Sequence, residues 1–254
     1  MNIVCIGSGN VATHFAIALK AIGADIVQVW SHDGKNAEIL AALTKAEPIS
    51  NWDDLDRSAD CYLIAVKDDA IAGVAAHLTD VKGVVIHTSG ATPMSVLSEV
   101  KSGYGVIYPL QTFSKSKAVD MTQVPLCIEA DQPLTLEKIQ VIAQLLSPKV
   151  SVITSQQRSI LHLAAVFACN FSNHLYQLSS GLLEQYNLNF DLLKPLILET
   201  AEKVQSNAPA EAQTGPASRG DQKTIKKHLD LLNGNPDLQK IYETLSNSIK
   251  KTHL

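Results

Sequence analysis

The sequence predicts an α/β protein in which a doubly wound, mostly parallel sheet is followed by an all-α region. Up to residue 154, short apolar runs of β-favouring residues alternate with helical periods, a pattern typical of strands and helices that build a parallel sheet. Near residue 155 the strand signals stop, and helical periods continue along the rest of the chain. We therefore expect two domains, at residues 1–154 and 155–254.

A strand, a glycine turn and a helix open the first domain. Residues 3–6 are an uninterrupted apolar run, and the segment Gly7-Ser8-Gly9-Asn10-Val11-Ala12 leads into a helical period. In this context the glycines indicate a dinucleotide-binding turn. Gly7 permits the tight turn, and Gly9 lets the backbone approach a pyrophosphate that rests on the first N–H groups of the helix. We predict cofactor contacts at Gly7, Ser8, Gly9, Asn10 and Val11.

The end of the second expected strand, residues 25–30, favours NADP over NAD. A strand that binds NAD usually ends in an acid that accepts a hydrogen bond from the ribose 2′-OH. Here Ser31 and His32 take that place, Lys35 opens the next helix, and Asp33 lies beyond the expected position. A hydroxyl, an imidazole and an ammonium group suit a 2′-phosphate, so we predict that Ser31, His32 and Lys35 bind it.

The rest of the sheet follows from similar runs. Further strands are expected at residues 48–50, 61–66, 83–87, 104–108, 125–129 and 149–153, with helices at 36–43 and 135–146 and an N-cap at Asp68 or Asp69. In a doubly wound sheet, ligands bind at the carboxyl ends of the strands. Val66, Lys67 and Ser89, together with Gly90, are therefore expected to flank a nicotinamide. For Lys67, a solvated loop charge is an equal alternative.

Composition excludes several other classes. The net charge is −4 with no basic block, so nucleic-acid binding has no electrostatic footprint. The chain starts without a signal peptide and contains no bilayer-length apolar run, so we expect a cytoplasmic protein. Four cysteines lie among apolar neighbours without a C-x-x-C pair: Cys5, Cys61, Cys127 and Cys169. They are expected to be buried and reduced, and no metal site is expected.

The second domain is expected to be helical throughout. The predicted helices cover residues 155–185, 190–207, 221–232, with Asp221 as the cap, and 236–251, with an irregular segment at 208–220. Four polar residues interrupt the apolar first helix: His162, Asn170, Asn173 and His174. At about 100° per residue, three of the four share one face. They indicate either the wall of a cleft between the domains or buried polar groups satisfied by backbone.

The segment 213–221, QTGPASRGD, contains one cation between small and helix-breaking residues. The planar fork of Arg219 is suited to a carboxylate or a phosphate. The alternative is an exposed arginine, or one that caps a helix. A metal site has no support at the spacing of His162 and His174, and no G-x-S-x-G elbow supports a serine hydrolase.

These stretches together resemble a known family. The relevant motifs are GSGNVA, HTSGA, YPLQTF, AAVFACNFSNHLY and QTGPASRGD. They resemble oxidoreductases that join a Rossmann-like domain to the helical "domain of unknown function 2520". The resemblance implies an NADP-binding N-terminal domain, a C-terminal domain similar to that of the 6-phosphogluconate dehydrogenase superfamily, and a homodimer formed through that helical domain. More distantly, the layout is similar to pyrroline-5-carboxylate reductase and ketopantoate reductase.

One departure from that superfamily bears on the chemistry. Its β-hydroxyacid dehydrogenases carry a catalytic lysine on the long helix with an asparagine one turn on, whereas Asn170 and His174 stand at the corresponding positions here. An iminium substrate would need less acid assistance than an alcohol or ketone. We expect nicotinamide to bind between the sheet edge and the long helix. The expected roles are proton donor for His162 or His174, substrate hydrogen bonds for Asn170 and Asn173, and anion clamp for Arg219.

The resulting hypothesis is an NADP-dependent oxidoreductase that acts on a small, anionic carbonyl or imine substrate. Two alternatives remain open: a non-catalytic dinucleotide-binding sensor or scaffold, and a coenzyme F420-linked NADP reductase. The apolar long helix and the leucine-rich stretch 192–198 also indicate a symmetric dimer, because a thin helical domain of this size buries few apolar residues alone.

Overall fold

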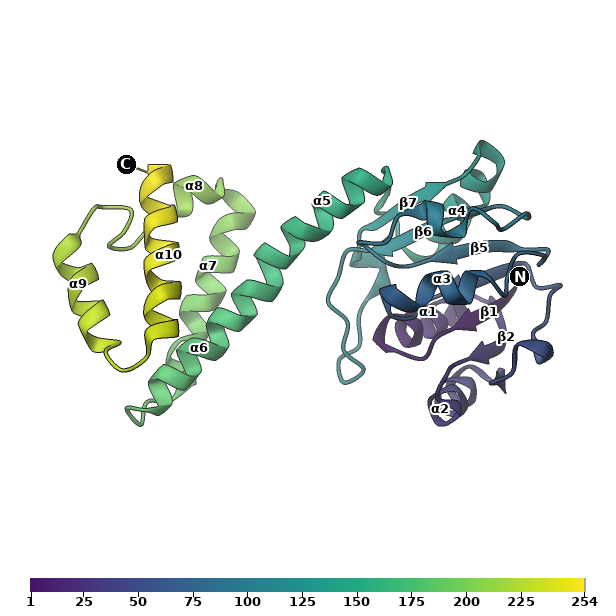
Figure 1. Ribbon diagram of the computed structural model, residues 1–254, viewed down its shortest axis with the longest axis horizontal. Helices are drawn as coiled ribbons and strands as arrows, with labels where there is room; N and C mark the ends of the chain where they lie inside the picture. The colour runs from purple at the N-terminus through teal and green to yellow at the C-terminus, as the bar shows by residue number, and fades with distance from the viewer. Residues whose placement is uncertain (254) are drawn as a thin grey trace. The chain divides into compact units, whose positions relative to one another are not determined.

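A computed structural model describes residues 1–253 (Figure 1). The chain divides into two compact units, Met1–Ser172 and Asn173–Leu254. Strands give way to helices after residue 152, close to the predicted domain boundary at 154, but the compact first unit extends to Ser172. The first turns of the predicted long helix therefore belong with the sheet.

The first unit is built on an eight-stranded sheet with the order β3-β2-β1-β4-β5-β6-β7-β8. Strands β1 to β6 are parallel, β7 is antiparallel to β6, and β8 is parallel to β7. The strands are β1 (Asn2–Ile6), β2 (Asp25–Trp30), β3 (Glu47–Ile49), β4 (Cys61–Ile64), β5 (Val84–His87), β6 (Tyr104–Pro109), β7 (Leu126–Ala130) and β8 (Val150–Val152). The predicted fold class is confirmed. The chain direction across the sheet reverses between β1 and β4, which is where this architecture binds ligands.

Helices cover both faces of the sheet because the strand side chains alternate. Ile3 and Cys5 of β1 face the layer that contains α1 (Asn10–Ala21), α2 (Gly34–Thr44) and α4 (Pro133–Leu146). Val4 and Ile6 face α3 (Ile71–Ala75) and the short helix η3 (Met94–Leu97). All four of these strand residues are fully buried. Apolar side chains on both sides of β1 explain why the strand sequence shows an unbroken apolar run.

The predicted long helix has a different pitch in its middle. It consists of α5 (Ser155–Ala165), a π-helical segment η5 (Val166–Phe171) and α6 (Ser172–Glu184). Thr154 and Gln157 form a capping box at its start. A π-helix turns less per residue than an α-helix. The angles predicted for an uninterrupted α-helix therefore do not apply across residues 166–171.

The second unit contains α6 and the remaining helices. These are η6 (Phe190–Leu192), α7 (Lys194–Ser206), α8 (Pro209–Ala212), α9 (Gln222–Leu231) and α10 (Pro236–His253). The cap at Asp221 is confirmed, because its side chain accepts a hydrogen bond from Thr224 N. The segment predicted to be irregular, residues 208–220, includes the short helix α8. No helix among residues 1–253 is long and apolar enough to cross a membrane.

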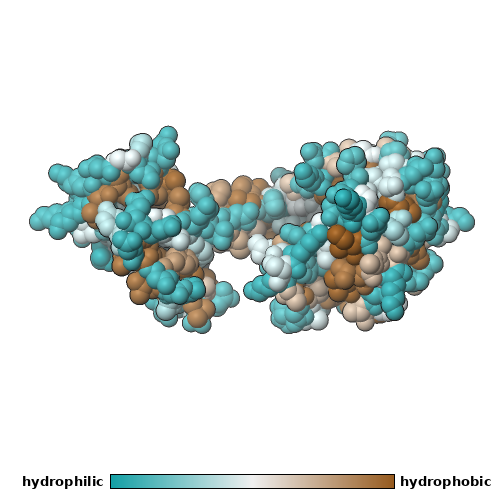
Figure 2. Space-filling model, turned by 90° about the horizontal axis from the view of Figure 1, so that it is seen from below, coloured by the Kyte–Doolittle hydropathy of each residue, from teal (hydrophilic) through white to brown (hydrophobic). Residues whose placement is uncertain are grey.

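Many apolar side chains of the second unit are exposed (Figure 2). They include Tyr186, Leu188, Leu192, Leu196, Leu198 and Leu231. Few of its described residues are buried: Ala217, Ile225, Leu232 and Ser246. The described part of this unit therefore exposes much apolar surface. Burial of that surface against another protein surface would be stabilising.

Two local predictions are wrong. Cys169, on the π segment, is exposed, whereas Cys5, Cys61 and Cys127 are buried as expected. Burial raises the pKa of the Cys5 thiol to about 12, so this sulfur is unreactive at neutral pH. Asp68 and Asp69 cap no helix, because both lie inside the short helix η2 (Asp68–Ala70), which Lys67 precedes without a side-chain cap.

Candidate functional site

The turn after β1 requires glycine at its first position. Gly7 has a φ of +117°, and a Cβ placed there would lie 2.2 Å from the carbonyl oxygen of Ala65. Its N–H donates to the Trp30 carbonyl at 2.8 Å. The turn is therefore fixed by the ends of the neighbouring strands, and any side chain at Gly7 would displace it.

The next glycine opens onto free space. Gly9 is the N-cap of α1 with ordinary extended backbone, no side chain caps the helix, and a Cβ at this position would meet no atom within 4 Å. The first N–H groups of α1 are thus available to an anion, which the positive end of the helix dipole also favours. These features fit the pyrophosphate of a dinucleotide.

The side chain of Asn10, a predicted cofactor contact, is engaged within the protein. Its Nδ2 donates to the Phe113 carbonyl at 2.9 Å, and Nε2 of His14 lies 2.9 Å from the Ser114 carbonyl oxygen. The rings of His14 and Phe113 are 5.1 Å apart. The loop between β6 and β7 is therefore held against the first turns of α1. This leaves the backbone N–H of Asn10, and that of the half-buried Val11, for a phosphate.

The end of β2 lies beside the glycine turn. The hydroxyl oxygens of Ser8 and Ser31 are 2.8 Å apart, and both side chains are buried. His32 and Lys35 are exposed. The nearest acid, Asp33, uses both carboxylate oxygens at the start of α2: one accepts from the Lys35 N–H at 3.1 Å and the other from Asn36 Nδ2 at 2.8 Å.

The loop after β5 is shaped by the side chain of Ser89, another predicted cofactor contact. Its Oγ accepts hydrogen bonds from the N–H of Ala91 at 3.2 Å and of Thr92 at 2.9 Å. Ser89 is buried, whereas Val66 after β4 is half-buried and Lys67 is exposed. Ser89 thus fixes the path of a loop at the carboxyl edge of the sheet, and its hydroxyl is largely occupied in doing so.

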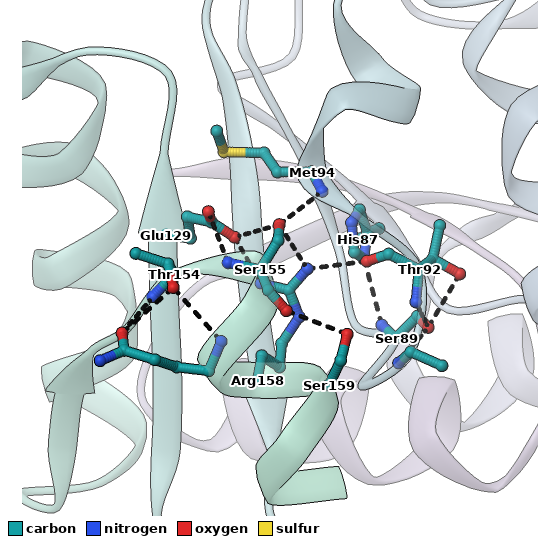
Figure 3. A network of polar contacts seen from close by, with 11 residues as sticks. His87, Ser89, Thr92, Met94, Glu129, Thr154, Ser155, Arg158 and Ser159 are labelled. Atoms are coloured by element: carbon teal, nitrogen blue, oxygen red, sulfur yellow. Dashed lines mark hydrogen bonds and ion pairs between the residues drawn. The ribbon is translucent and has the colours of Figure 1, made fainter. Parts of the chain in front are cut away.

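A buried ion pair anchors the start of α5 to this loop (Figure 3). Arg158, only 1% exposed, donates to Glu129 on β7 at 2.5 Å and to the Thr92 carbonyl at 2.7 Å. Glu129 also accepts from the N–H and the hydroxyl of Ser155, at 2.8 and 2.7 Å. The Ser155 hydroxyl oxygen in turn accepts from the N–H of Met94. One network therefore joins β7, α5 and the loop after β5.

His87 lies fully buried beneath the same loop. Its Nδ1 accepts a hydrogen bond from the Ser89 N–H at 3.2 Å, and its Nε2 has no hydrogen-bond partner among residues 1–253. Burial, and secondly the charge of Arg158, lower the pKa of His87 to about 3. The ring is therefore neutral at physiological pH and can accept this backbone hydrogen bond.

Of the four polar residues predicted on the long helix, His162 is half-buried and the other three are exposed. Nδ1 of His162 lies 3.1 Å from Oη of Tyr108, at the end of β6. Asn170 lies on the π segment of the first unit, whereas Asn173 and His174 belong to the second unit. The prediction that three of them share one face assumed an uninterrupted α-helix. That assumption is wrong, because residues 166–171 are π-helical.

The loop around Arg219 has a defined shape. Gly215 and Gly220 adopt φ values of +108° and +68°, and the Asp221 N–H donates to the Pro216 carbonyl at 2.9 Å. Arg219 is exposed and forms no ion pair with any residue in the range 1–253. Hydrogen bonds from Thr224, and more weakly the charge of Arg219, lower the pKa of Asp221.

Comparison with known proteins assigns both parts of the chain. Residues 1–86 match the family described as "Oxidoreductase family, NAD-binding Rossmann fold", and residues 124–249 match "Domain of unknown function (DUF2520)". The chain is 43% identical to a provisionally named NADP oxidoreductase from Bacteroides fragilis, with 98% of each chain covered and a TM-score of 0.93. The chain belongs to this oxidoreductase family.

Other structures share the fold of the DUF2520 oxidoreductases. A Thermotoga maritima protein is 25% identical over 99% of this chain and 98% of its own, with a TM-score of 0.81. An imine reductase from Myxococcus stipitatus, solved in complex with NADP+, is 16% identical over 99% and 92% of the two chains, with a TM-score of 0.61. No curated protein matches the sequence significantly. The family match and the Bacteroides fragilis relative show that the chain is an oxidoreductase with a Rossmann NAD(P)-binding fold.

Sequence reasoning missed three polar residues of this DUF2520 oxidoreductase: Tyr108, Glu129 and Arg158. Tyr108 and Glu129 interrupt apolar strands, so their polar groups were a usable signal, whereas Arg158 lies among polar residues at the start of α5. Buried polar groups need partners, and these partners lie far apart in the sequence. No local pattern identifies such pairs.

Proposed function

We propose that the protein is an NADP-dependent oxidoreductase that transfers a hydride between NADP(H) and a small anionic carbonyl or imine compound. The observation that carries the proposal is the pairing of an open glycine turn at Gly9 with an acid, Asp33, whose carboxylate is already used as a helix cap. The turn fits a pyrophosphate, and the adjacent groups fit a phosphorylated ribose.

The preference for NADP follows from the groups around the end of β2. An NAD-binding site usually has an acid at the end of the second strand, where it accepts from the ribose 2′-OH, whereas Ser31 stands there and Asp33 lies further on, as the cap of α2. Ser31, beside the glycine turn, and the exposed His32 and Lys35 instead offer donors and positive charge to a 2′-phosphate. The name of the Bacteroides fragilis relative, and NADP+ in the complex of the imine reductase, agree with this choice.

The cofactor supplies the hydride, and we propose that the chain binds and orients it. The backbone of Gly7, Ser8, Gly9, Asn10 and Val11 would hold the pyrophosphate. The strand ends at Val66 and Lys67, and the loop shaped by Ser89, would flank the nicotinamide and exclude water.

For the substrate, the sequence-predicted roles remain part of the proposal. Asn170 and Asn173 would donate hydrogen bonds, and His162 or His174 would supply a proton. Arg219, which forms no ion pair with residues 1–253, would bind a carboxylate. With no lysine at the positions of Asn170 and His174, an imine is the better of the two substrate classes, because a protonated imine is already electrophilic. The relatives named as imine reductases support this class by fold alone.

We also propose a homodimer. The second unit exposes leucines on several helices and buries few residues, so a second copy of this chain is the natural cover for its apolar surface. The resemblance to the DUF2520 family implies the same arrangement.

Two measurements test the proposed function. Calorimetry with NADPH and NADH should show at least tenfold tighter binding of NADPH; equal or reversed affinities would remove the 2′-phosphate argument. NADPH oxidation should then be followed with pyruvate, as a carbonyl acid, and 1-pyrroline-5-carboxylate, as an anionic imine. Tight binding without oxidation of NADPH by either compound favours the non-catalytic sensor. Reduction of NADP+ by reduced coenzyme F420 would favour the deazaflavin-linked alternative.

A further inference from the structure

Three segments of the first unit meet at a tyrosine–histidine contact. Tyr108 is the next-to-last residue of β6, His162 lies on α5, and Gly90 belongs to the loop after β5. Oη of Tyr108 lies 3.1 Å from Nδ1 of His162, and the two rings meet edge to face at 76°. A Cβ on Gly90 would lie 2.7 Å from His162 Nδ1 and 2.8 Å from Tyr108 Cε2. Glycine at this position therefore lets the pair pack directly against the loop.

The location of this contact is informative. The loop after β5 lies at the carboxyl edge of the parallel strands, where this architecture binds the reactive end of a dinucleotide. One nitrogen of the His162 ring, Nδ1, is used by Tyr108, and the other, Nε2, has no hydrogen-bond partner among the described residues. The residue is half-buried, and Nε2 is not among the fully buried polar atoms that lack a partner, so this nitrogen remains accessible.

We propose that His162 donates the proton of the reaction through Nε2 and that Tyr108 is the residue that positions it. The inference rests on the proposed function and adds Tyr108 and Gly90 to it. It also selects His162 over His174, which is exposed and has no hydrogen-bond partner among residues 1–253 to orient its ring.

The chemistry of the pair supports this assignment. Burial raises the pKa of the Tyr108 phenol, with smaller raising contributions from Cys127 and Cys169 and an opposing one from Arg158. The phenol therefore keeps its proton. A phenol is a better donor than an imidazole N–H, and a neutral imidazole nitrogen is a good acceptor, so the hydroxyl donates to Nδ1. The neutral ring then carries its hydrogen on Nε2.

In the protonated ring, Nδ1–H donates to the phenol oxygen and Nε2–H is free for the substrate. As hydride from NADPH reaches a carbonyl or imine carbon, the π electron pair moves to oxygen or nitrogen, and that atom takes the Nε2 proton. The products are the alcohol or amine, NADP+ and a neutral ring, which solvent reprotonates. Because the phenol can donate or accept, Tyr108 holds the ring in both states.

The charged and titratable groups that act on the Tyr108 phenol come from three elements. Arg158 lies on α5, one turn before His162, Cys127 lies on β7 and Cys169 lies on the π segment. Arg158 is the charged member, and Glu129 pairs with it directly.

A second tyrosine–histidine pair provides an internal control. Nδ1 of His228 lies 2.8 Å from Oη of Tyr242, between α9 and α10 of the second unit, with a similar edge-to-face geometry. No part of the dinucleotide turn belongs to these helices. A ligand bound at the proposed cofactor site should therefore affect His162 and leave His228 unchanged.

The test is NMR of protein with 15N-labelled histidine rings, which distinguishes the two neutral tautomers. We expect His162 as the Nε2–H tautomer in the wild type, and loss of that preference in Tyr108→Phe. Addition of NADP+ should shift the His162 ring signals and not those of His228. A His162 ring with its hydrogen on Nδ1, or an unchanged tautomer in Tyr108→Phe, would overturn the role of Tyr108.

Gly90→Ala tests the packing without removing either ring. The added methyl should separate the pair and reproduce the tautomer change of Tyr108→Phe. Gly181→Ala is the matched control, since its Cβ would meet no atom within 4 Å. If calorimetry shows that NADP+ binds while the His162 signals stay unchanged, the donor role is wrong and the proposed function stands. If NADP+ does not bind at all, the proposed function itself fails.

Discussion

Arg158 on α5 and Glu129 on β7 form an ion pair whose arginine is 1% exposed, and both residues bind Ser155 at the helix start. A buried charge that loses its partner is strongly destabilising, by about 3–5 kcal/mol, whereas replacing both partners with neutral groups costs less. The pair is therefore a sensitive point in the attachment of α5 to the sheet.

We expect Arg158→Met and Glu129→Gln each to lower the free energy of unfolding by about 3–5 kcal/mol. The double variant should lose clearly less than the sum, because neither charge is left unpaired. Urea denaturation of the four proteins measures this coupling. Strictly additive losses would show that the two side chains contribute separately.

The buried His87 makes stability depend on pH. The pKa of the folded-state ring is lowered to about 3, while an unfolded histidine titrates near pH 6.5. Between these values the unfolded chain binds more protons, so stability falls as pH drops, by up to about 1.4 kcal/mol per pH unit.

His87→Asn should remove this contribution while leaving an oxygen to accept the Ser89 N–H. Its unfolding free energy should therefore change less between pH 6.5 and 4.5 than that of the wild type. Denaturant melts at several pH values supply the comparison. Parallel pH dependences in the two proteins would assign the acid sensitivity to other groups.

The two glycines of the dinucleotide turn should behave differently when substituted. Gly9→Val should remain folded, because free space surrounds that position, but should weaken NADPH binding by at least 100-fold through collision with the pyrophosphate. Gly7→Ala should instead unfold or lose most of its stability, because of its positive φ and the 2.2 Å approach to Ala65.

Circular dichroism and calorimetry separate these outcomes. Undiminished NADPH affinity in folded Gly9→Val would contradict the proposed pyrophosphate site. A fully stable Gly7→Ala would contradict the reason given for that glycine.

Arg219 is expected to bind an anionic substrate. Arg219→Lys keeps the charge without the planar fork, so both Arg219→Lys and Arg219→Ala should weaken binding of 1-pyrroline-5-carboxylate by about 1.5–3 kcal/mol. NADPH affinity and melting temperature should stay unchanged. Loss of stability without loss of ligand binding would make Arg219 structural, and a loss confined to NADPH would place its anion on the cofactor.

The exposed leucines of the second unit are expected to lie in a dimer interface. Light scattering should find a dimer at micromolar concentration, and Leu196→Glu, at a position 62% exposed in the single chain, should shift it toward monomer. Lys223→Glu, an exposed charge reversal on α9, is the control. A wild type that is wholly monomeric at that concentration would exclude the dimer.

The sequence predicted the sheet well because its strands are buried on both faces and therefore appear as unbroken apolar runs. It also predicted the positions of the glycine turn and the Asp221 cap, which depend on local backbone geometry. The π segment was missed because six residues are too few for apolar periodicity to distinguish a π-helix from an α-helix.

The candidate site was only partly predictable. Gly9, Ser31 and His162 were named as candidates because each interrupts or ends a regular pattern. The contacts between candidates and other residues were not predicted: Ser8 with Ser31, Asn10 with Phe113, and His162 with Tyr108 join different segments of the chain. Such pairings depend on the tertiary arrangement of the segments, so sequence alone identified the residues without their contacts.

The Gly7 turn also bears on the thermodynamics of binding. Its N–H is already bonded to Trp30, and the Ala65 carbonyl borders it on the other side, so neighbouring strands shape it before any ligand arrives. Because the loop is already ordered, binding does not require a further loss of its conformational entropy. More of the intrinsic interaction between backbone amides and a pyrophosphate therefore remains available as affinity.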